Sequence, residues 1–379
     1  MNQNHVMAIT QTCTGCSACQ AVCPIQAISM QYNQDGFLEP SVDETRCIQC
    51  GKCLNTCPLG KESPKIRQAS YYGWHQEDAV CYKSTSGGAF RGFADKILEE
   101  NGVVFGANYN QEFTEVIFSD SDSCLLEHLQ KSKYIVSNPI GAFKKVKEQL
   151  ESGRRVLFSG APCQVAGLSR FLGKEYEKLI TVDFVCGGMP SLRFWQEHLV
   201  MLEKKYGAKV KSVDFRSKRN GWGKGYLEII FENGKTYFTR DYLDSFYHCF
   251  YDCHINVRNT CLDCEFHEKH FSDITIADFW GFHQLGIEGA QRGLSLIISN
   301  SEKGTAFVEG ISNLCLQKID NKYSDYAVAK LRRNEEEHQS RNAFFALAKS
   351  IGFERAAKKC CPATTVSHIL KYIKLRLNR

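Results

Sequence analysis

The sequence has 379 residues, of which 43% are hydrophobic and 23% are charged. These values exclude a disordered or fibrous chain, and the length is sufficient for two or three globular domains. The formal net charge of +5 is too small to indicate a nucleic-acid-binding protein. The sequence shows no export signal before its first cysteines and no apolar stretch long enough to span a bilayer, so we expect a cytoplasmic protein.

Cysteines are unusually frequent, with 19 in the chain. The segment CTGCSACQAVCP at 13–24 is repeated as CIQCGKCLNTCP at 47–58, and both follow the pattern C-x2-C-x2-C-x3-C-P. In this pattern three cysteines hold one [4Fe-4S] cluster, and the fourth, before proline, is a ligand of the other cluster. The predicted ligands of the first cluster are Cys13, Cys16, Cys19 and Cys57. The predicted ligands of the second cluster are Cys47, Cys50, Cys53 and Cys23.

Structural zinc sites also use C-x2-C motifs, but they usually take their ligands as two separated pairs. The repeated triplet with its C-P ending therefore favours iron–sulfur clusters. Residues 5–60 resemble a bacterial two-cluster ferredoxin domain, which we expect to occupy 1–60. A strand pair turning at Asp35-Gly36 is expected to bring the two cysteine loops together. Residues 61–69 are polar and contain Pro64, which is typical of a linker.

From residue 70 onward, helix-like and strand-like stretches alternate. We predict helices over 88–100, 143–151, 165–171 and 192–206, and strands over 103–109, 154–160 and 179–186. A hairpin turning at Asn233-Gly234 is expected within 213–238. The alternation predicts an α/β domain over 70–320, with a mixed sheet flanked by helices. The expected fold is therefore an N-terminal ferredoxin-like domain, a larger mixed-sheet α/β domain and a helical C-terminal tail.

Ser86, Gly87 and Gly88 precede the first predicted helix of the larger domain. A helix start presents free N–H groups and a positive dipole end to an anion. The turn would thus suit the phosphate of a nucleotide cofactor. An ordinary serine cap followed by glycines gives the same pattern, so the turn by itself leaves both interpretations open.

Several longer segments extend this pattern: STSGGAF (84–90), SKYIVS (132–137), VLFSGAPCQVAGLSRFL (156–172), LITVDFVCGGMPS (179–191), DFRSKRNGW (214–222), CLDCEFHEKHFSDITIADFWGF (261–282) and RGLSLIISNSEKG (292–304). Together they resemble the beta-subunit family of coenzyme F420 hydrogenases and dehydrogenases over about residues 70–310. The resemblance implies a domain that binds FAD and passes electrons between a hydride partner and iron–sulfur clusters. It also implies that the flavin diphosphate is held by Ser86, Gly87, Gly88, Lys133, Arg216 and Lys218.

Two aromatic residues of these segments, Trp222 and Trp280, would line the flavin ring or belong to the core. Four further cysteines of the segments could form a third [4Fe-4S] site: Cys163, Cys186, Cys261 and Cys264. Cys163 and Cys186 each follow a strand-like run, which would place them at the same end of the sheet. A zinc site formed by Cys249, Cys253, Cys261 and Cys264 is an alternative. Cys163 could also be a reactive thiol.

The last part of the chain, 321–379, is expected to be a helical tail that becomes basic toward its end. Within 364–379, apolar residues recur at helical spacing with cations between them. This pattern is typical of a helix that contacts a membrane surface or a partner protein, and equally of a packed terminal helix with a basic outer face.

These observations predict an FAD- and iron–sulfur-dependent oxidoreductase. It would pass electrons between its [4Fe-4S] clusters and a hydride partner, either a deazaflavin coenzyme or a small organic substrate. The expected partners are a redox protein or a small hydride donor or acceptor, with possible peripheral contact to a membrane and none to nucleic acid. Two alternatives remain open: a non-catalytic electron-relay subunit, and a zinc-rich binding scaffold.

Overall fold

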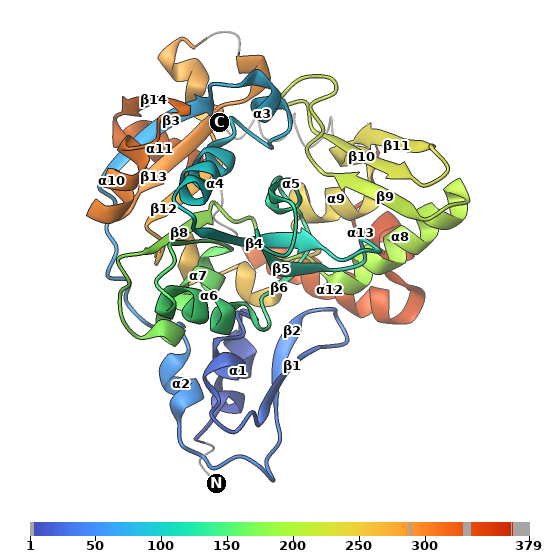
Figure 1. Cartoon of the computed structure of the whole chain (residues 1–379). Helices are drawn as coiled ribbons and strands as arrows, with labels where there is room; N and C mark the ends of the chain where they lie inside the picture. The colour runs from blue at the N-terminus through green and yellow to red at the C-terminus, as the bar shows by residue number, and fades with distance from the viewer. Residues whose placement is uncertain (1–3, 288–289, 329–334, 365, 367–379) are drawn as a thin grey trace.

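The computed structural model describes residues 4–287, 290–328, 335–364 and 366. A narrow N-terminal part, blue in Figure 1, projects from a broad body that contains the remaining elements. Among the described residues, no helix combines the length and the apolarity that crossing a lipid bilayer requires. The basic helix predicted over 364–379 lies almost entirely outside the described residues.

The N-terminal part consists of short elements around a strand pair. Its elements are η1 (Val6–Thr12), α1 (Ala18–Val22), β1 (Ile28–Tyr32), β2 (Leu38–Val42) and α2 (Lys52–Thr56). The strands β1 and β2 pair antiparallel, which confirms the predicted pair. The turn holds Gly36 at a φ of +83°, and a Cβ atom there would lie 2.6 Å from the backbone nitrogen of Arg193. Glycine therefore lets the turn dock directly onto the body.

The body is organised around a nine-stranded mixed sheet with the order β14-β3-β13-β12-β8-β7-β4-β5-β6. The strands are β3 (Ala69–His75), β4 (Val103–Tyr109), β5 (Val116–Asp120), β6 (Ser137–Asn138), β7 (Val156–Ser159), β8 (Leu179–Phe184), β12 (Ile274–Asp278), β13 (Ser295–Ser299) and β14 (Leu314–Ile319). The neighbours β4, β7, β8 and β12 are parallel. Their carboxyl ends meet at one edge, where α/β sheets commonly place their sites. The predicted mixed sheet is confirmed.

Helices cover both faces of this sheet. They are α3 (Asp78–Tyr82), α4 (Ala89–Glu99), α5 (Leu126–Leu129), α6 (Ala142–Glu151), α7 (Pro162–Leu172) and α10 (Glu302–Glu309). Side chains of alternate strand residues belong to different cores: Phe158 packs with α6 and α7, whereas Leu157 packs with α4 and α10. The period of two is that of a strand buried on both faces. The helix predicted over 165–171 begins earlier, at Pro162, because proline is favoured at a first helical position.

A second, three-stranded antiparallel sheet stands beside the large one. It contains β9 (Val210–Asp214), β10 (Tyr226–Phe231) and β11 (Thr236–Arg240), and α8 (Leu192–Tyr206) packs nearby. The predicted hairpin turn at Asn233-Gly234 is confirmed. Its strands pair with β9 rather than with the large sheet, which the sequence pattern did not distinguish.

The C-terminal residues return to the body as α11 (Asn321–Val328), α12 (Glu335–Ile351) and α13 (Phe353–Cys360). Short 3-10 helices complete the elements: η2 (Asp241–Leu243), η3 (Asn259–Cys261), η4 (Glu265–His267), η5 (Trp280–Leu285) and η6 (Ala290–Arg292), together with the α-helix α9 (Ser245–Tyr251). The buried rings of Phe344 and Phe353 stack against Phe194 of α8. The helical character expected for the tail is confirmed, but its described helices contribute to the core.

Candidate metal centres and the glycine turn

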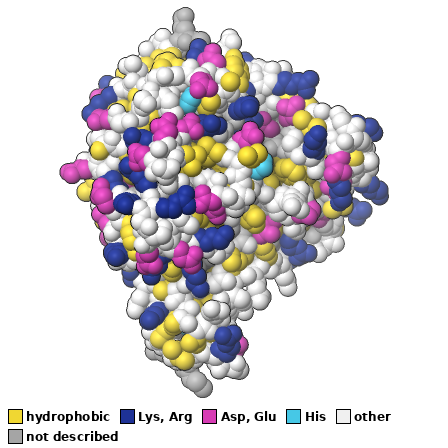
Figure 2. Space-filling view, in the orientation of Figure 1, with side chains coloured by type: hydrophobic (Ala, Val, Ile, Leu, Met, Phe, Trp, Pro, Cys, Tyr) yellow, Lys and Arg dark blue, Asp and Glu magenta, His cyan; other side chains and the backbone are white. Residues whose placement is uncertain are grey.

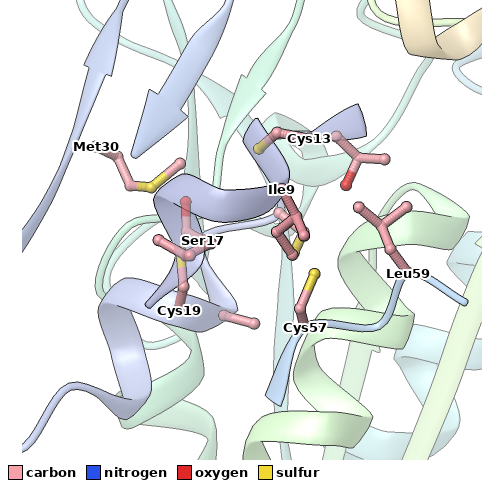
Figure 3. Close-up of a pocket in the computed structure, with 11 residues that line it drawn as sticks. Ile9, Cys13, Ser17, Cys19, Met30, Cys57 and Leu59 are labelled. Carbon is pink, nitrogen blue, oxygen red and sulfur yellow. The ribbon is translucent and has the colours of Figure 1, made fainter. Parts of the chain in front are cut away.

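One cavity in the N-terminal part is lined by four cysteines, which we call the inner site: Cys13, Cys16, Cys19 and Cys57. Figure 3 shows Cys13, Cys19 and Cys57 around this cavity, with Ile9, Met30 and Leu59 along its apolar wall. The loop between η1 and α1 can wrap the cavity because Gly15 and Ser17 both adopt a positive φ. The four sulfurs thus face a shared space.

Burial dominates the chemistry of the inner site. It raises the pKa of the Cys16 thiol to about 12, and the neighbouring Cys13 and Cys57 thiols add to the rise. It also raises the pKa of the other three thiols. Thiolates in such surroundings require a compensating positive charge, which a bound metal supplies. Four buried sulfurs around one cavity are a donor set that fits a [4Fe-4S] cluster.

A second cavity of the N-terminal part is lined by the remaining four cysteines of the repeats, which we call the outer site: Cys23, Cys47, Cys50 and Cys53. The grouping places Cys57 with the first repeat and Cys23 with the second, in the crossed arrangement that the spacing predicts. Only Cys53 of this group is buried, and Cys50 is exposed. Their role as cluster ligands stays a prediction.

Four cysteines of the body also approach one another, and we call them the central site: Cys163, Cys186, Cys261 and Cys264. Cys163 lies in the first turn of α7, directly after β7, and Cys186 follows β8. Burial raises the pKa of the Cys163 thiol well above its usual value, and the three other thiols and Cys16 raise it further. Backbone N–H groups donate to two of the sulfurs, from Gly188 to Cys186 and from Met189 to Cys261, each at 3.4 Å. Such bonds are typical around iron–sulfur clusters.

The alternative zinc site is not assembled in the structure. Its members Cys261 and Cys264 lie in the central site, while Cys253 lies beside Cys361. The sequence offered two partners for the C-x2-C pair, and the meeting of strand ends decides for Cys163 and Cys186.

The central site and the inner site are neighbours, joined by α7 and by the segment before Cys261. Gly167 lies one turn after Cys163, and a Cβ atom at this position would be 3.1 Å from the sulfur of Cys16. The buried guanidinium of Arg258 donates to the carbonyl oxygens of Cys13 at 3.1 Å and Leu38 at 2.6 Å. The Thr260 hydroxyl also donates to the Cys13 carbonyl, at 3.0 Å. Sequence analysis missed both residues, because no local pattern marks a donor to a loop some 245 positions away.

The glycine turn, formed by Ser86, Gly87 and Gly88, lies at the start of α4. Gly88 has a φ of +91°, and a Cβ atom on Gly87 would lie 2.4 Å from the Gly73 carbonyl oxygen. The backbone N–H of Gly87 donates to the Ser295 hydroxyl at 3.0 Å. Close packing of the turn against the large sheet thus requires the glycines.

Cations gather around the glycine turn. The Lys218 ammonium donates to the carbonyl oxygens of Cys81, Ser86 and Arg292 at 2.6–2.7 Å. Burial lowers the pKa of Lys218 to about 8, and Lys131 and Arg216 lower it further. Burial likewise lowers the pKa of Lys133 to about 7, again with a contribution from Lys131. Because these like charges disfavour one another, the group suits a negatively charged ligand.

An aromatic pair lies close to these cations. The rings of Trp222 and Trp280 stack with centroids 4.7 Å apart. The Arg216 guanidinium lies over Trp280 at 5.4 Å and pairs with the Asp278 carboxylate at 2.9 Å. Trp222 is buried, whereas Trp280 is 38% exposed. The structure therefore places the predicted flavin residues in one region, with their donors engaged within the chain.

Comparisons with known proteins bear on both parts of the molecule. Residues 12–61 match the family model of the 4Fe-4S dicluster domain. Residues 153–322 match the model that describes the C terminus of the coenzyme F420 hydrogenase/dehydrogenase beta subunit. The chain joins a 4Fe-4S dicluster domain to this beta-subunit domain. The resemblance inferred from the sequence is thereby confirmed, whereas the predicted boundaries at 60, 70 and 320 stay predictions.

Two curated relatives are similar over most of this beta-subunit chain. One is the F subunit of the F(420)H(2) dehydrogenase from Methanosarcina mazei, 23% identical over 362 residues that cover 90% of this chain and 94% of the relative. The other is the coenzyme F420-dependent sulfite reductase of Methanocaldococcus jannaschii, 23% identical over 358 residues. That alignment covers 88% of this chain but only 51% of the reductase.

A solved structure, the F420-reducing [NiFe] hydrogenase complex from Methanosarcina barkeri, contains a chain that is 14% identical with a TM-score of 0.42. The match covers 79% of this chain and 94% of the hydrogenase chain. With both family domains present and the two curated relatives at hand, the protein is an iron–sulfur subunit of the oxidoreductase type.

Proposed function

We propose that the protein is an iron–sulfur flavoprotein that passes electrons between three [4Fe-4S] clusters and a hydride partner at FAD. The observation that carries the proposal is the contact between the inner and central sites, where Cys16 packs against the α7 helix that also bears Cys163. Bound [4Fe-4S] clusters supply one-electron transfer, and a bound flavin exchanges either a hydride or single electrons. The chain would thus join one-electron and two-electron chemistry.

The residues of the chain have distinct tasks in this proposal. The inner, outer and central cysteines would hold the clusters, and Arg258 and Thr260 would fix the Cys13 loop against the body. Their donation to a buried carbonyl group keeps the two sites in one relative position. The buried thiols of Cys16 and Cys163 lie away from water, so this part of the route would be shielded from solvent.

The flavin diphosphate would be held at the glycine turn by Lys133, Arg216 and Lys218. Three cations close to a turn at a helix start supply the charge and the donors that a diphosphate requires. The mutual repulsion between the cations would be relieved by the bound anion. We therefore expect flavin binding to raise the pKa values of Lys133 and Lys218 and to take up protons near neutral pH.

The hydride partner is proposed from the names of the relatives. Both act on or depend on coenzyme F420 by name, which makes a deazaflavin the first substrate to test and a small organic substrate the second. An electron-relay subunit without its own substrate is a further candidate, favoured by the exposure of the outer site. Activity with a deazaflavin and an artificial one-electron acceptor would distinguish the enzyme from the relay.

The test of the proposal is anaerobic purification followed by quantification of iron, sulfide and flavin per chain. We expect about twelve irons, about twelve sulfides and about one FAD, since each cubane cluster holds four of each atom. About eight irons would contradict the central cluster, and protein without flavin would contradict the FAD assignment. Colourless protein that contains zinc but no sulfide would contradict the whole proposal and would favour the scaffold alternative.

A further inference from the structure

A separate group of metal-binding side chains lies on the C-terminal side of α9. One potential ligand atom from each of His248, Cys253 and Cys361 lies within 4.8 Å of the other two. His248 and Cys361 are buried, and Cys253 is partly buried. His248 belongs to α9, Cys253 follows this helix, and Cys361 follows α13. The group therefore joins two elements that are 108 positions apart in the sequence.

The imidazole of His248 is oriented for metal binding. Its Nε2 atom lies 3.6 Å from the sulfur of Cys253. Its Nδ1 atom lies 2.8 Å from a carboxylate oxygen of Asp252. Metal-bound histidines commonly direct one ring nitrogen to the metal and donate from the other nitrogen to a carboxylate, which fixes the tautomer and the orientation of the ring. His248 has both contacts.

A disulfide between Cys253 and Cys361 is the competing interpretation, since their Cα atoms are 6.5 Å apart. Two arguments favour a metal. A disulfide gives no role to a buried imidazole whose nitrogen faces the sulfurs. The same chain carries cysteines that must stay reduced to hold iron–sulfur clusters, and conditions that preserve those thiols also preserve Cys253 and Cys361 as thiols.

We propose that His248, Cys253 and Cys361 bind one zinc ion. Two thiolates and one imidazole are ligands that zinc prefers, and its tetrahedral geometry leaves a fourth position for water or another small ligand. Because the ligands come from both sides of the contact between α9 and α13, the ion fastens the C-terminal helices to the body. This site is distinct from the inner, outer and central sites and does not depend on the flavin.

The first experiment measures zinc and iron per chain by elemental analysis of full-length protein purified without oxygen. We expect about one zinc in the unaltered chain. We expect at least a fivefold loss of zinc in the Cys361→Ser and His248→Ala variants, with the iron content unchanged. Cys360→Ser is the matched control, because Cys360 is the neighbouring exposed cysteine outside the ligand group, and it should retain the zinc. Protein without zinc, or equal zinc in all variants, would overturn the assignment.

A second measurement needs no variant and so does not depend on whether the variants fold. The unaltered protein is denatured without oxygen in the presence of a chelator and an alkylating reagent but without a reductant. Alkylation of both Cys253 and Cys361, read by peptide mass spectrometry, is expected for zinc thiolates. A cross-linked peptide pair that contains these two residues would show a disulfide and overturn the proposal.

Discussion

The inner and outer sites have the same cysteine spacing but different surroundings. At the inner site Cys16 and Cys19 are buried, α7 packs against the ligand loop, and Arg258 and Thr260 hold it from the body. At the outer site Cys50 is exposed and the neighbouring Ile48 is 64% exposed. Figure 2 shows hydrophobic side chains and cations together at this tip of the molecule. Spacing thus selects the ligands, whereas the surroundings direct one site toward the body and the other toward solvent.

The largest expected effect comes from removing a ligand at each site. Cys16→Ala and Cys50→Ala should each lose about four irons per chain. Cys16→Ala should also lower the thermal unfolding midpoint substantially more, because its loss leaves a hole at a buried contact with α7, whereas Cys50 faces solvent. Iron analysis and thermal melts monitored by circular dichroism measure both quantities. Equal shifts of the midpoint would show that the two sites do not differ in their coupling to the body.

An intermediate effect is expected from the arginine that holds the inner loop. Arg258→Met would leave the buried carbonyl groups of Cys13 and Leu38 without this donor, and we expect a loss of about 3 kcal/mol in the free energy of unfolding. The matched control is Arg46→Met, since the exposed Arg46 donates to the Ile25 carbonyl beside the outer site. Denaturant unfolding should show little change for this control. A similar loss in both variants would remove the proposed difference between the sites.

The smallest effect on stability is expected at the exposed tip. Ile48→Glu should leave the unfolding midpoint and the iron content unchanged, because the side chain is mostly in solvent. If the outer site receives electrons from a partner protein, the added charge should slow reduction by a ferredoxin several-fold without changing reduction by dithionite. Ile66→Glu, at a 73% exposed position outside the outer site, serves as the control. Stopped-flow absorbance measures both rates, and equal rates in both variants would contradict docking at the tip.

Local patterns in the sequence predicted much of the structure. The repeat predicted which cysteines group together, because its spacing acts over a few residues, and the strand pair around Gly36 followed from its turn. The meeting of Cys163 with Cys186 followed from a general rule on the ends of parallel strands. Cluster binding by these residues stays a prediction.

The parts that sequence analysis missed depend on contacts between distant positions. No pattern around Arg258 indicates that its guanidinium reaches the Cys13 loop, and none around Cys361 indicates that it meets His248 and Cys253. The tail was expected to be polar because its surface residues are numerous, yet a few phenylalanines suffice to bury its described helices. Such tertiary packing overrides average composition.

The single turn of α7 between Cys163 and Gly167 has a consequence for how electron flow could be controlled. Four residues of helix rise by about 6 Å. A stiff rod this short cannot bend, so the spacing between the inner and central sites is fixed by the backbone itself. Regulation of the current through the molecule would then act at its two ends, at the arrival of a donor near Cys50 or of a substrate near Trp280, and not in between.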